Sequence, residues 1–183
     1  MKKITLISFA LLFMISASFG QKKKQTETVA VFKWMTIEEA AALNKTHPKK
    51  IFIDVYTDWC GWCTKMVKET FSDSIIKQYM AENFYTVKLN AEQKDSIVFN
   101  GKTYRNPSAN TPRSSHQLAI SLLQGQMSYP SFIFLNEKLE TLTMVKGYRT
   151  AKEFEPILHY YAENNKDKMT FDKYLETFKG SFK

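Results

Sequence analysis

The sequence predicts an α/β fold with a central mixed β-sheet flanked by helices. Apolar runs rich in β-branched and aromatic residues alternate with segments of helical periodicity, an order that indicates parallel strands joined by helical crossovers. The last two predicted strands are joined by a tight turn at Asn136 and Glu137, so they pair antiparallel and the sheet is mixed. The only two cysteines, Cys60 and Cys63, lie where an apolar strand passes into a helix.

Residues 1–20 have the pattern of a secretory signal peptide. Two lysines near the start precede an apolar run over residues 4–15, and small residues then lead to a very polar stretch that begins at Gln21. The apolar run is shorter than the ~20 residues of a spanning helix, so we expect cleavage before Gln21 rather than the alternative, an uncleaved membrane anchor. The mature protein is then periplasmic or secreted, with no stable membrane insertion. Residues 21–28 are polar and predict a flexible leader.

The rest of the chain is long enough for one domain with a sizeable core. We expect this domain over residues 29–163 and a C-terminal helical extension over residues 164–183. The net charge of the whole chain is +8, but most of its lysines are dispersed among acidic residues. This pattern is typical of a solvated surface, so we expect no nucleic-acid partner.

The first elements of the domain surround the cysteine pair. A short strand is predicted over residues 29–34, followed by a helix that Thr36 caps and that has acidic residues in its first turn. The apolar run of residues 50–56 predicts the central buried strand. Apolar residues at helical spacing after the second cysteine predict a helix over about residues 60–70.

The middle of the chain continues the alternation. Residues 71–74 indicate a break and a new helix start, and the helix that follows ends at Asn83. Residues 84–90 read as a second buried strand, so strand, helix and strand together predict a parallel pair with a right-handed crossover. An Asn-Gly dipeptide predicts a small hairpin over residues 97–104, and residues 106–115 form a polar loop that contains proline.

The last third of the chain supplies the antiparallel part of the sheet and three helices. Residues 118–123 predict a helix that a glycine closes, and residues 131–135 and 141–146 predict two strands. Residues 154–161 show the apolar spacing of a long amphipathic helix that packs on the sheet. Residues 169–178 show the same spacing and predict a further helix at the C-terminus.

Two residues separate the cysteines, which suits either a reversible disulfide at a helix start or half of a tetrahedral metal site. The helix N-terminus favours thiolate over thiol, because it presents unsatisfied amides and the positive end of the dipole. A structural disulfide across so short a loop would stabilise the fold little. A closed zinc site needs four ligands, and His47, His116 and His159 are scattered. We therefore expect a redox site without a metal, and a copper- or zinc-binding thiolate module is the alternative.

Residues 29–163 resemble the thioredoxin superfamily, and within it the secreted thioredoxin-like domains of bacterial disulfide-interchange systems. Residues 58–73 are most similar to the C-terminal domain of the membrane thiol reductant. The features that carry the resemblance follow one another in the family's order: Asp54 on the central strand, Trp59-Cys60-Gly61-Trp62-Cys63 at the helix start, Lys88 on the next strand, Tyr129-Pro130 before a later strand, and Gly147 on the last one.

The resemblance implies a role for four residues in thiol chemistry. Cys60 is expected to be the attacking thiolate, nearer solvent, and Cys63 to resolve the mixed disulfide. Asp54 is expected to take the proton that Cys63 loses, since burial raises the pKa of a carboxyl group. The alternative for Asp54 is a solvent-facing position at a strand end. Lys88 is expected to tune Asp54 by its charge, and an exposed lysine is the alternative.

The resemblance also implies residues that bind the substrate. Trp59 and Trp62 are expected to form an apolar rim for the partner's cysteine region, although tryptophans can equally belong to a core. If the bond before Pro130 is cis, as in the family, the backbone of Tyr129 lies beside the sulfurs, where it can pair with an extended substrate segment.

Three features depart from the family pattern. Trp62 replaces a proline common in the active-site dipeptide, Lys68 stands where many members have a helix-kinking proline, and residues 91–123 form an insertion before the cis-Pro strand.

Together these observations predict a thiol-disulfide oxidoreductase that reduces protein disulfides in the cell envelope without a cofactor. The expected partners are cysteine-containing envelope proteins and an upstream thiol donor such as a membrane reductant. An oxidase or isomerase of the same fold is the alternative, since these activities differ in the relative stability of disulfide and dithiol.

Overall fold

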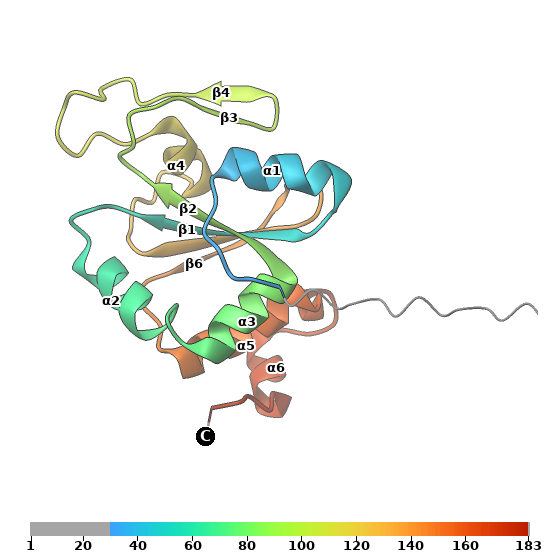
Figure 1. Cartoon of the computed structure of the whole chain (residues 1–183). Helices are drawn as coiled ribbons and strands as arrows, with labels where there is room; N and C mark the ends of the chain where they lie inside the picture. The colour runs from blue at the N-terminus through green and yellow to red at the C-terminus, as the bar shows by residue number, and fades with distance from the viewer. Residues whose placement is uncertain (1–29, 183) are drawn as a thin grey trace, which may run out of the picture.

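One mixed sheet of four strands organises the computed structural model, which describes residues 30–182 (Figure 1). Its strands are β1 (Lys50–Tyr56), β2 (Phe84–Asn90), β5 (Ser131–Leu135) and β6 (Thr141–Lys146). The strand order is β2-β1-β5-β6, with β1 parallel to β2 and antiparallel to β5, and β5 antiparallel to β6. The predicted mixed sheet is confirmed. The signal peptide and leader expected over residues 1–28 lie outside the described residues.

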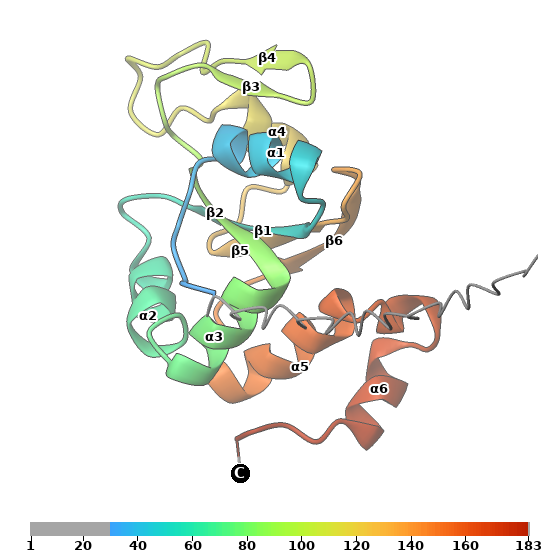
Figure 2. The ribbon, with the colours of Figure 1, turned by 45° about the vertical axis from the view of Figure 1, so that its right-hand side comes forward.

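Helices cover both faces of this sheet. They are α1 (Ile37–Thr46), α2 (Gly61–Glu69), α3 (Ser74–Asn83), α4 (Gln117–Leu122), α5 (Ala151–Ala162) and α6 (Phe171–Thr177). One face carries α1 and α4, and the other carries α2, α3 and α5, as the two views agree (Figures 1 and 2). The C-terminal helix α6 follows a short 3-10 turn and packs against α5. The expected thioredoxin-like arrangement with an additional C-terminal helix is therefore confirmed.

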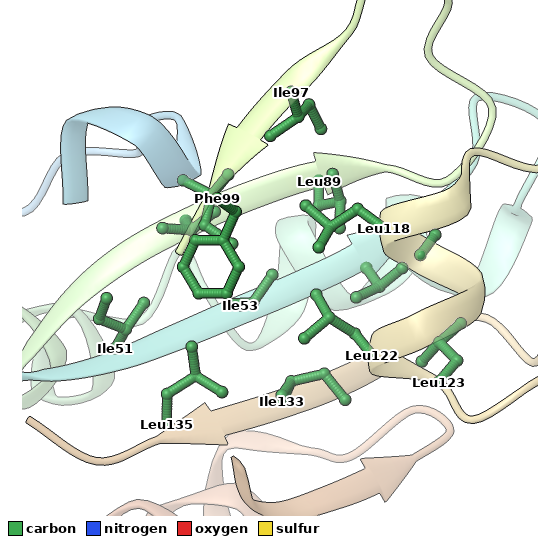
Figure 3. Close-up of a cluster of buried hydrophobic side chains, with 14 of the residues drawn as sticks. Ile51, Ile53, Leu89, Ile97, Phe99, Leu118, Leu122, Leu123, Ile133 and Leu135 are labelled. Carbon is green, nitrogen blue, oxygen red and sulfur yellow. The ribbon is translucent and has the colours of Figure 1, made fainter. Parts of the chain in front are cut away.

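The central strand β1 sends alternate side chains to the two sides of the sheet, as the period of two requires. Ile51 and Ile53 join the apolar cluster under α1 and α4 (Figure 3). Phe52 joins a second cluster under α2, α3 and α5. Asp54 lies two residues after Phe52, so its side chain points to the same face of the sheet, the face that α2 covers.

The cluster beneath α2 is largely aromatic. The ring of Phe52 lies 5.9 Å from Phe71, 5.7 Å from Phe132 and 5.8 Å from Phe154, centroid to centroid. Met66 of α2 is fully buried in the same cluster. Truncating a buried phenylalanine typically costs about 3–5 kcal/mol, so this packing fixes α2 firmly against the sheet. The helix that carries the cysteines thus rests on a rigid platform.

The strand expected over residues 29–34 does not form in the described residues 30–34. Only Met35 contacts the sheet by an isolated parallel bridge to Val87 of β2. The side chains of Phe32 and Trp34 pack into the aromatic cluster, with the two rings 5.1 Å apart. The packing of these partly buried rings, rather than a ladder of hydrogen bonds, sets the path of the segment, and for this reason the prediction was wrong.

The predicted hairpin in the middle of the chain is confirmed. Strands β3 (Ile97–Phe99) and β4 (Lys102–Tyr104) pair antiparallel around Asn100 and Gly101. Both turn residues have positive φ, 49° and 75°, which is the geometry that an Asn-Gly turn adopts most readily. The hairpin packs over α1 and α4, away from the four-stranded sheet (Figure 2).

Candidate active site

The cysteine pair lies at the start of α2, immediately beyond the carboxyl end of β1. Cys60 is the N-cap residue, and its Sγ accepts a hydrogen bond from the backbone N–H of Cys63 at 3.1 Å. The amide of Cys60 donates to the carbonyl of Thr57, which closes the turn between strand and helix. The two sulfurs form a disulfide. A sulfur that accepts a helix amide is stabilised as thiolate when the disulfide opens.

Both half-cystines are almost covered by their surroundings. Cys60 is 6% exposed and Cys63 is 4% exposed. The expected difference in solvent exposure between the two is therefore slight in the disulfide form. What distinguishes them is position, because Cys60 caps the helix while Cys63 lies inside its first turn.

Asp54 is buried beneath the helix, with 1% of its surface exposed, and is not the solvent-facing residue of the alternative interpretation. Its register partner on β2 is Lys88, whose Nζ lies 3.2 Å from Asp54 Oδ2. The ammonium also lies over the ring of Tyr56, 4.3 Å from the centroid, and 5.4 Å from that of Trp34. Lys88 is thus held on the carboxylate by an ion pair and two aromatic rings.

Burial raises the pKa of Asp54 to about 6, although the ammonium of Lys88 acts in the opposite direction. Its other oxygen, Oδ1, has no hydrogen-bond partner within residues 30–182, and the same is true of the buried hydroxyl of Thr57. A cavity of about 330 Å³ beside these groups is lined by both Cys63 and Lys88. A carboxyl group with this pKa can exchange a proton near neutral pH.

The outer side of the site is aromatic and exposed. Trp59 and Trp62 are 54% and 58% exposed, so neither belongs to the core. Trp59 packs edge-on against Tyr129, with centroids 5.9 Å apart, and donates its Nε1–H to Glu92 at 2.9 Å. Trp62 packs against Tyr148, with centroids 5.5 Å apart. The cysteine turn is therefore flanked by two aromatic pairs.

The bond between Tyr129 and Pro130 is cis, as expected. The carbonyl of Pro130 accepts a hydrogen bond from the amide of Gly147 at 2.8 Å. Gly147 follows the end of β6 and has φ of 81°, a left-handed conformation that favours glycine. The ring contact between Tyr129 and Trp59 places the cis-Pro loop beside the cysteine turn.

A family model described as a thioredoxin-like domain matches residues 37–162 of the chain. The chain belongs to the thioredoxin-like domain family. The resemblance stated from the sequence is thereby confirmed. The Cys60–Cys63 disulfide at the start of α2 lies within the residues that this family model matches.

Similar proteins and structures agree with this membership. The chain is 37% identical over 67 residues to the thiol:disulfide interchange protein DsbD of Citrobacter koseri, a match that covers 36% of this chain and 12% of that protein. It is 26% identical over 114 residues to the protein of the same name from Actinobacillus pleuropneumoniae, covering 61% of this chain and 16% of that one. The chain thus corresponds to a small part of these relatives.

Solved structures share the fold at low sequence identity. A thioredoxin from Thermus thermophilus superposes with a TM-score of 0.52 at 18% identity, covering 70% of this chain and 85% of that one. A structure described as DsbH oxidoreductase gives a TM-score of 0.51 at 18% identity, covering 79% and 94%. These values support the fold assignment of the thioredoxin-like domain.

Two further properties concern the described part of the chain. No helix within residues 30–182 is long and apolar enough to cross a membrane. In the same residues, no group of three or more histidine, cysteine or acidic side chains is placed to hold a metal ion.

Sequence reasoning did not identify several side chains that complete the thioredoxin-like site. They are Trp34 and Tyr56 around Lys88, Tyr148 beside Trp62, and Glu92 and Arg113 beside Trp59. Tyr56 ends the same strand as Asp54, so the register with β2 could have placed it near Lys88. The others come from distant segments, and their positions depend on the tertiary fold.

Proposed function

We propose that this protein reduces disulfides of proteins in the cell envelope. The observation that carries the proposal is a disulfide whose first sulfur caps a helix, next along the chain from a strand with a buried carboxylate of raised pKa. A capped sulfur favours thiolate, and a carboxyl group of raised pKa can accept a proton near neutral pH. Both properties are needed for a thiol pair that attacks a folded partner's disulfide and then releases it.

In the proposed reaction, the thiolate of Cys60 attacks one sulfur of the partner's disulfide. That disulfide bond breaks, the second partner sulfur leaves as thiolate, and a mixed disulfide with Cys60 forms. Cys63 then loses its proton to Asp54 and attacks the sulfur of Cys60. The partner's first sulfur leaves as thiolate, so the partner gains two electrons and this protein becomes oxidised at the Cys60–Cys63 pair.

Asp54 and Lys88 serve the second step in this proposal. The carboxylate accepts the proton of Cys63, and the cavity that Cys63 and Lys88 both line gives solvent access for its later release. Lys88 keeps a large fraction of Asp54 ionised at neutral pH, because its charge opposes the effect of burial. Trp59, Trp62 and the backbone of Tyr129 are proposed to hold the partner's segment, with Pro130 shaping the loop.

The reduction potential of the Cys60–Cys63 couple tests the reducing direction. Thiol reductants and thiol oxidants of this fold differ in potential, from about −270 mV for thioredoxin to about −120 mV for a strong oxidant. We expect the Cys60–Cys63 couple, equilibrated against glutathione or dithiothreitol, to lie nearer the thioredoxin value. A potential near −120 mV would instead indicate an oxidase, and one near −180 mV an isomerase.

The proposed location and partners follow from the sequence and the relatives. The signal-like residues 1–20 suggest export, and the relatives are named thiol:disulfide interchange proteins. We propose cysteine-containing envelope proteins as substrates and a membrane thiol reductant as the electron donor. Mass spectrometry of the protein from an envelope fraction is expected to show an N-terminus at Gln21, and an intact Met1 in the membrane fraction would contradict export as a soluble protein.

A further inference from the structure

A loop from the inserted segment, residues 105–116, lies next to the cysteine turn. In both views this loop and the connection from β1 to α2 are at the same end of the molecule (Figures 1 and 2). Its base is fixed by two buried residues. The side-chain amide of Asn106 donates to the carbonyl of Ser114 at 3.0 Å, and the backbone N–H of His116 donates to the carbonyl of Ala91 at 2.7 Å. The tip of the loop is thus held in a defined place.

The loop sets Arg113 against the outer side of the active site. The guanidinium carbon lies over the ring of Trp59, 5.1 Å from the centroid, and Trp59 is the residue before Cys60. Arg113 has φ of 61°, a left-handed conformation that is unfavourable for a residue with a Cβ. An unfavourable backbone conformation beside a functional group is a reason to look for a role.

Arg113 has no carboxylate partner within 4.0 Å among residues 30–182, in contrast to Lys88 and Lys65 beside the same turn. Lys88 pairs with the carboxylate of Asp54, and Lys65, which lies over Trp62, is 3.8 Å from Glu69. A guanidinium stacked on a ring keeps the donors on its edge free, in the fork geometry that fits a carboxylate. Arg113 therefore presents an unused carboxylate-binding group to solvent.

The nearby acidic side chains are engaged with neutral donors. Glu92 accepts the indole N–H of Trp59, and Asp58 accepts the side-chain amide of Asn90 at 2.9 Å. Both acids, together with Lys94 and Arg113, line a polar cavity of about 320 Å³ between the loop and the cysteine turn. The formal charges of these four side chains balance, so a ligand would be selected by short-range hydrogen bonding to Arg113 rather than by a long-range field.

We propose that Arg113 binds a carboxylate side chain of the partner, so that the protein reduces fastest those disulfides whose reacting cysteine has an aspartate or glutamate within a few residues. The inference rests on the proposed function, because it concerns the protein segment that the aromatic rim would hold. Arg113 acts in binding only, and the exchange of sulfur bonds is the same for every partner.

The test uses symmetric disulfides of a short peptide with one cysteine. Aspartate is placed in turn at each of three positions on either side of the cysteine, and matched peptides carry asparagine or lysine there. The reduced protein is mixed with each disulfide, and the second-order rate of peptide thiol release is measured. We expect the aspartate peptide to react five- to tenfold faster than the asparagine peptide at one or two positions.

Two variants separate Arg113 from general charge effects. Arg113→Gln is expected to lower the aspartate preference, measured as the ratio of the rates with aspartate and asparagine peptides, to less than twofold. Lys94→Gln removes a cation that lines the same cavity and is expected to retain the preference. A faster reaction with lysine peptides, or a preference that survives in Arg113→Gln, would overturn the inference and leave the proposed function standing. If the wild-type protein reduces none of the peptides, the proposed function fails and the inference fails with it.

Discussion

The two sides of the Cys60–Cys63 disulfide differ sharply in how they meet solvent. On the inner side, Asp54 is buried and Lys88 is held on it by an ion pair. On the outer side, Trp59 and Trp62 expose more than half of their surface. A buried carboxylate without full hydrogen bonding costs stability, and exposed tryptophans gain little from the fold. Neither arrangement serves folding well, which is why both point to function.

We propose that the two sides have separate tasks. Proton transfer requires a group of shifted pKa, and burial provides that shift on the inner side. Partner recognition requires apolar surface that is free before the partner arrives, and the aromatic pairs provide it on the outer side. Changes on the inner side should therefore alter pH dependence, whereas changes on the outer side should alter the affinity for large partners.

The largest effect is expected from the cysteines, which lie between the two sides. Cys63→Ser should leave a long-lived mixed disulfide with substrate proteins, because the resolving thiol is missing. Cys60→Ser should trap almost nothing, and both variants should lose insulin reduction by about a thousandfold or more. Non-reducing gels of envelope extracts measure the trapping. Equal trapping by both variants would mean that Cys60 is not the attacking residue.

The next effect in size concerns Asp54. Asp54→Asn keeps the shape of the side chain and removes its ability to take a proton, so turnover at pH 7 should fall by roughly 100-fold, the lower end of the range for general bases. Asp58→Asn is the matched control, since Asp58 is exposed and lines the cavity that Cys63 and Lys88 also line. It should lower turnover by less than twofold. Full turnover of Asp54→Asn across neutral pH would restrict Asp54 to a structural role.

The same side chain should also make stability depend on pH. Its pKa rises from an ordinary value of 3.8 to about 6 on folding, so the folded protein holds the proton more tightly than the unfolded chain. The free energy of unfolding should therefore fall by up to ~3 kcal/mol as pH rises from about 4 to 6. Above about pH 6 it should level off. Urea denaturation of the oxidised protein at several pH values measures this. Asp54→Asn should show a smaller fall over the same interval.

The contrast between the two sides also explains what the sequence could predict. The strands that carry Asp54 and Lys88 are rich in β-branched and aromatic residues, and a helical segment separates them, so their bounds and parallel pairing follow from the pattern. The pairing then brings the two charges together. Arg113 and Trp59, by contrast, meet through a loop whose path depends on buried Asn106 and His116. No periodicity in a polar loop encodes such a contact.

A smaller effect is expected on the outer side. Trp59→Ala and Trp62→Ala should each raise KM for a protein disulfide about three- to tenfold, because an exposed ring that a partner covers contributes to binding. Neither change should alter the rate with oxidised dithiothreitol, which is too small to contact both rings. The free energy of unfolding should change by less than about 1 kcal/mol, since both side chains are exposed. Equal losses with both substrates would place the tryptophans in the chemical step.

The smallest effect should come from Lys88, and it tests whether the inner side works by charge. Lys88 lowers the pKa of Asp54, so Lys88→Met should raise that pKa above about 6. At pH 7 less of the carboxylate is then ionised, and turnover should fall about two- to fourfold. At pH 8.5 Asp54 is again mostly ionised, so the variant should match the wild-type protein. The measurement is the pH profile of kcat/KM for insulin, whose acidic limb should move to higher pH in the variant.

Lys68→Met provides the control for Lys88→Met. Lys68 lines the same cavity and is exposed, and it makes no ion pair with Asp54. Its removal deletes one positive charge near Cys63 without changing the partner of the buried carboxylate. If Lys68→Met moves the acidic limb as far as Lys88→Met does, the effect is one of general charge. If only Lys88→Met moves it, the 3.2 Å ion pair sets the pH range in which the inner side can accept the proton of Cys63.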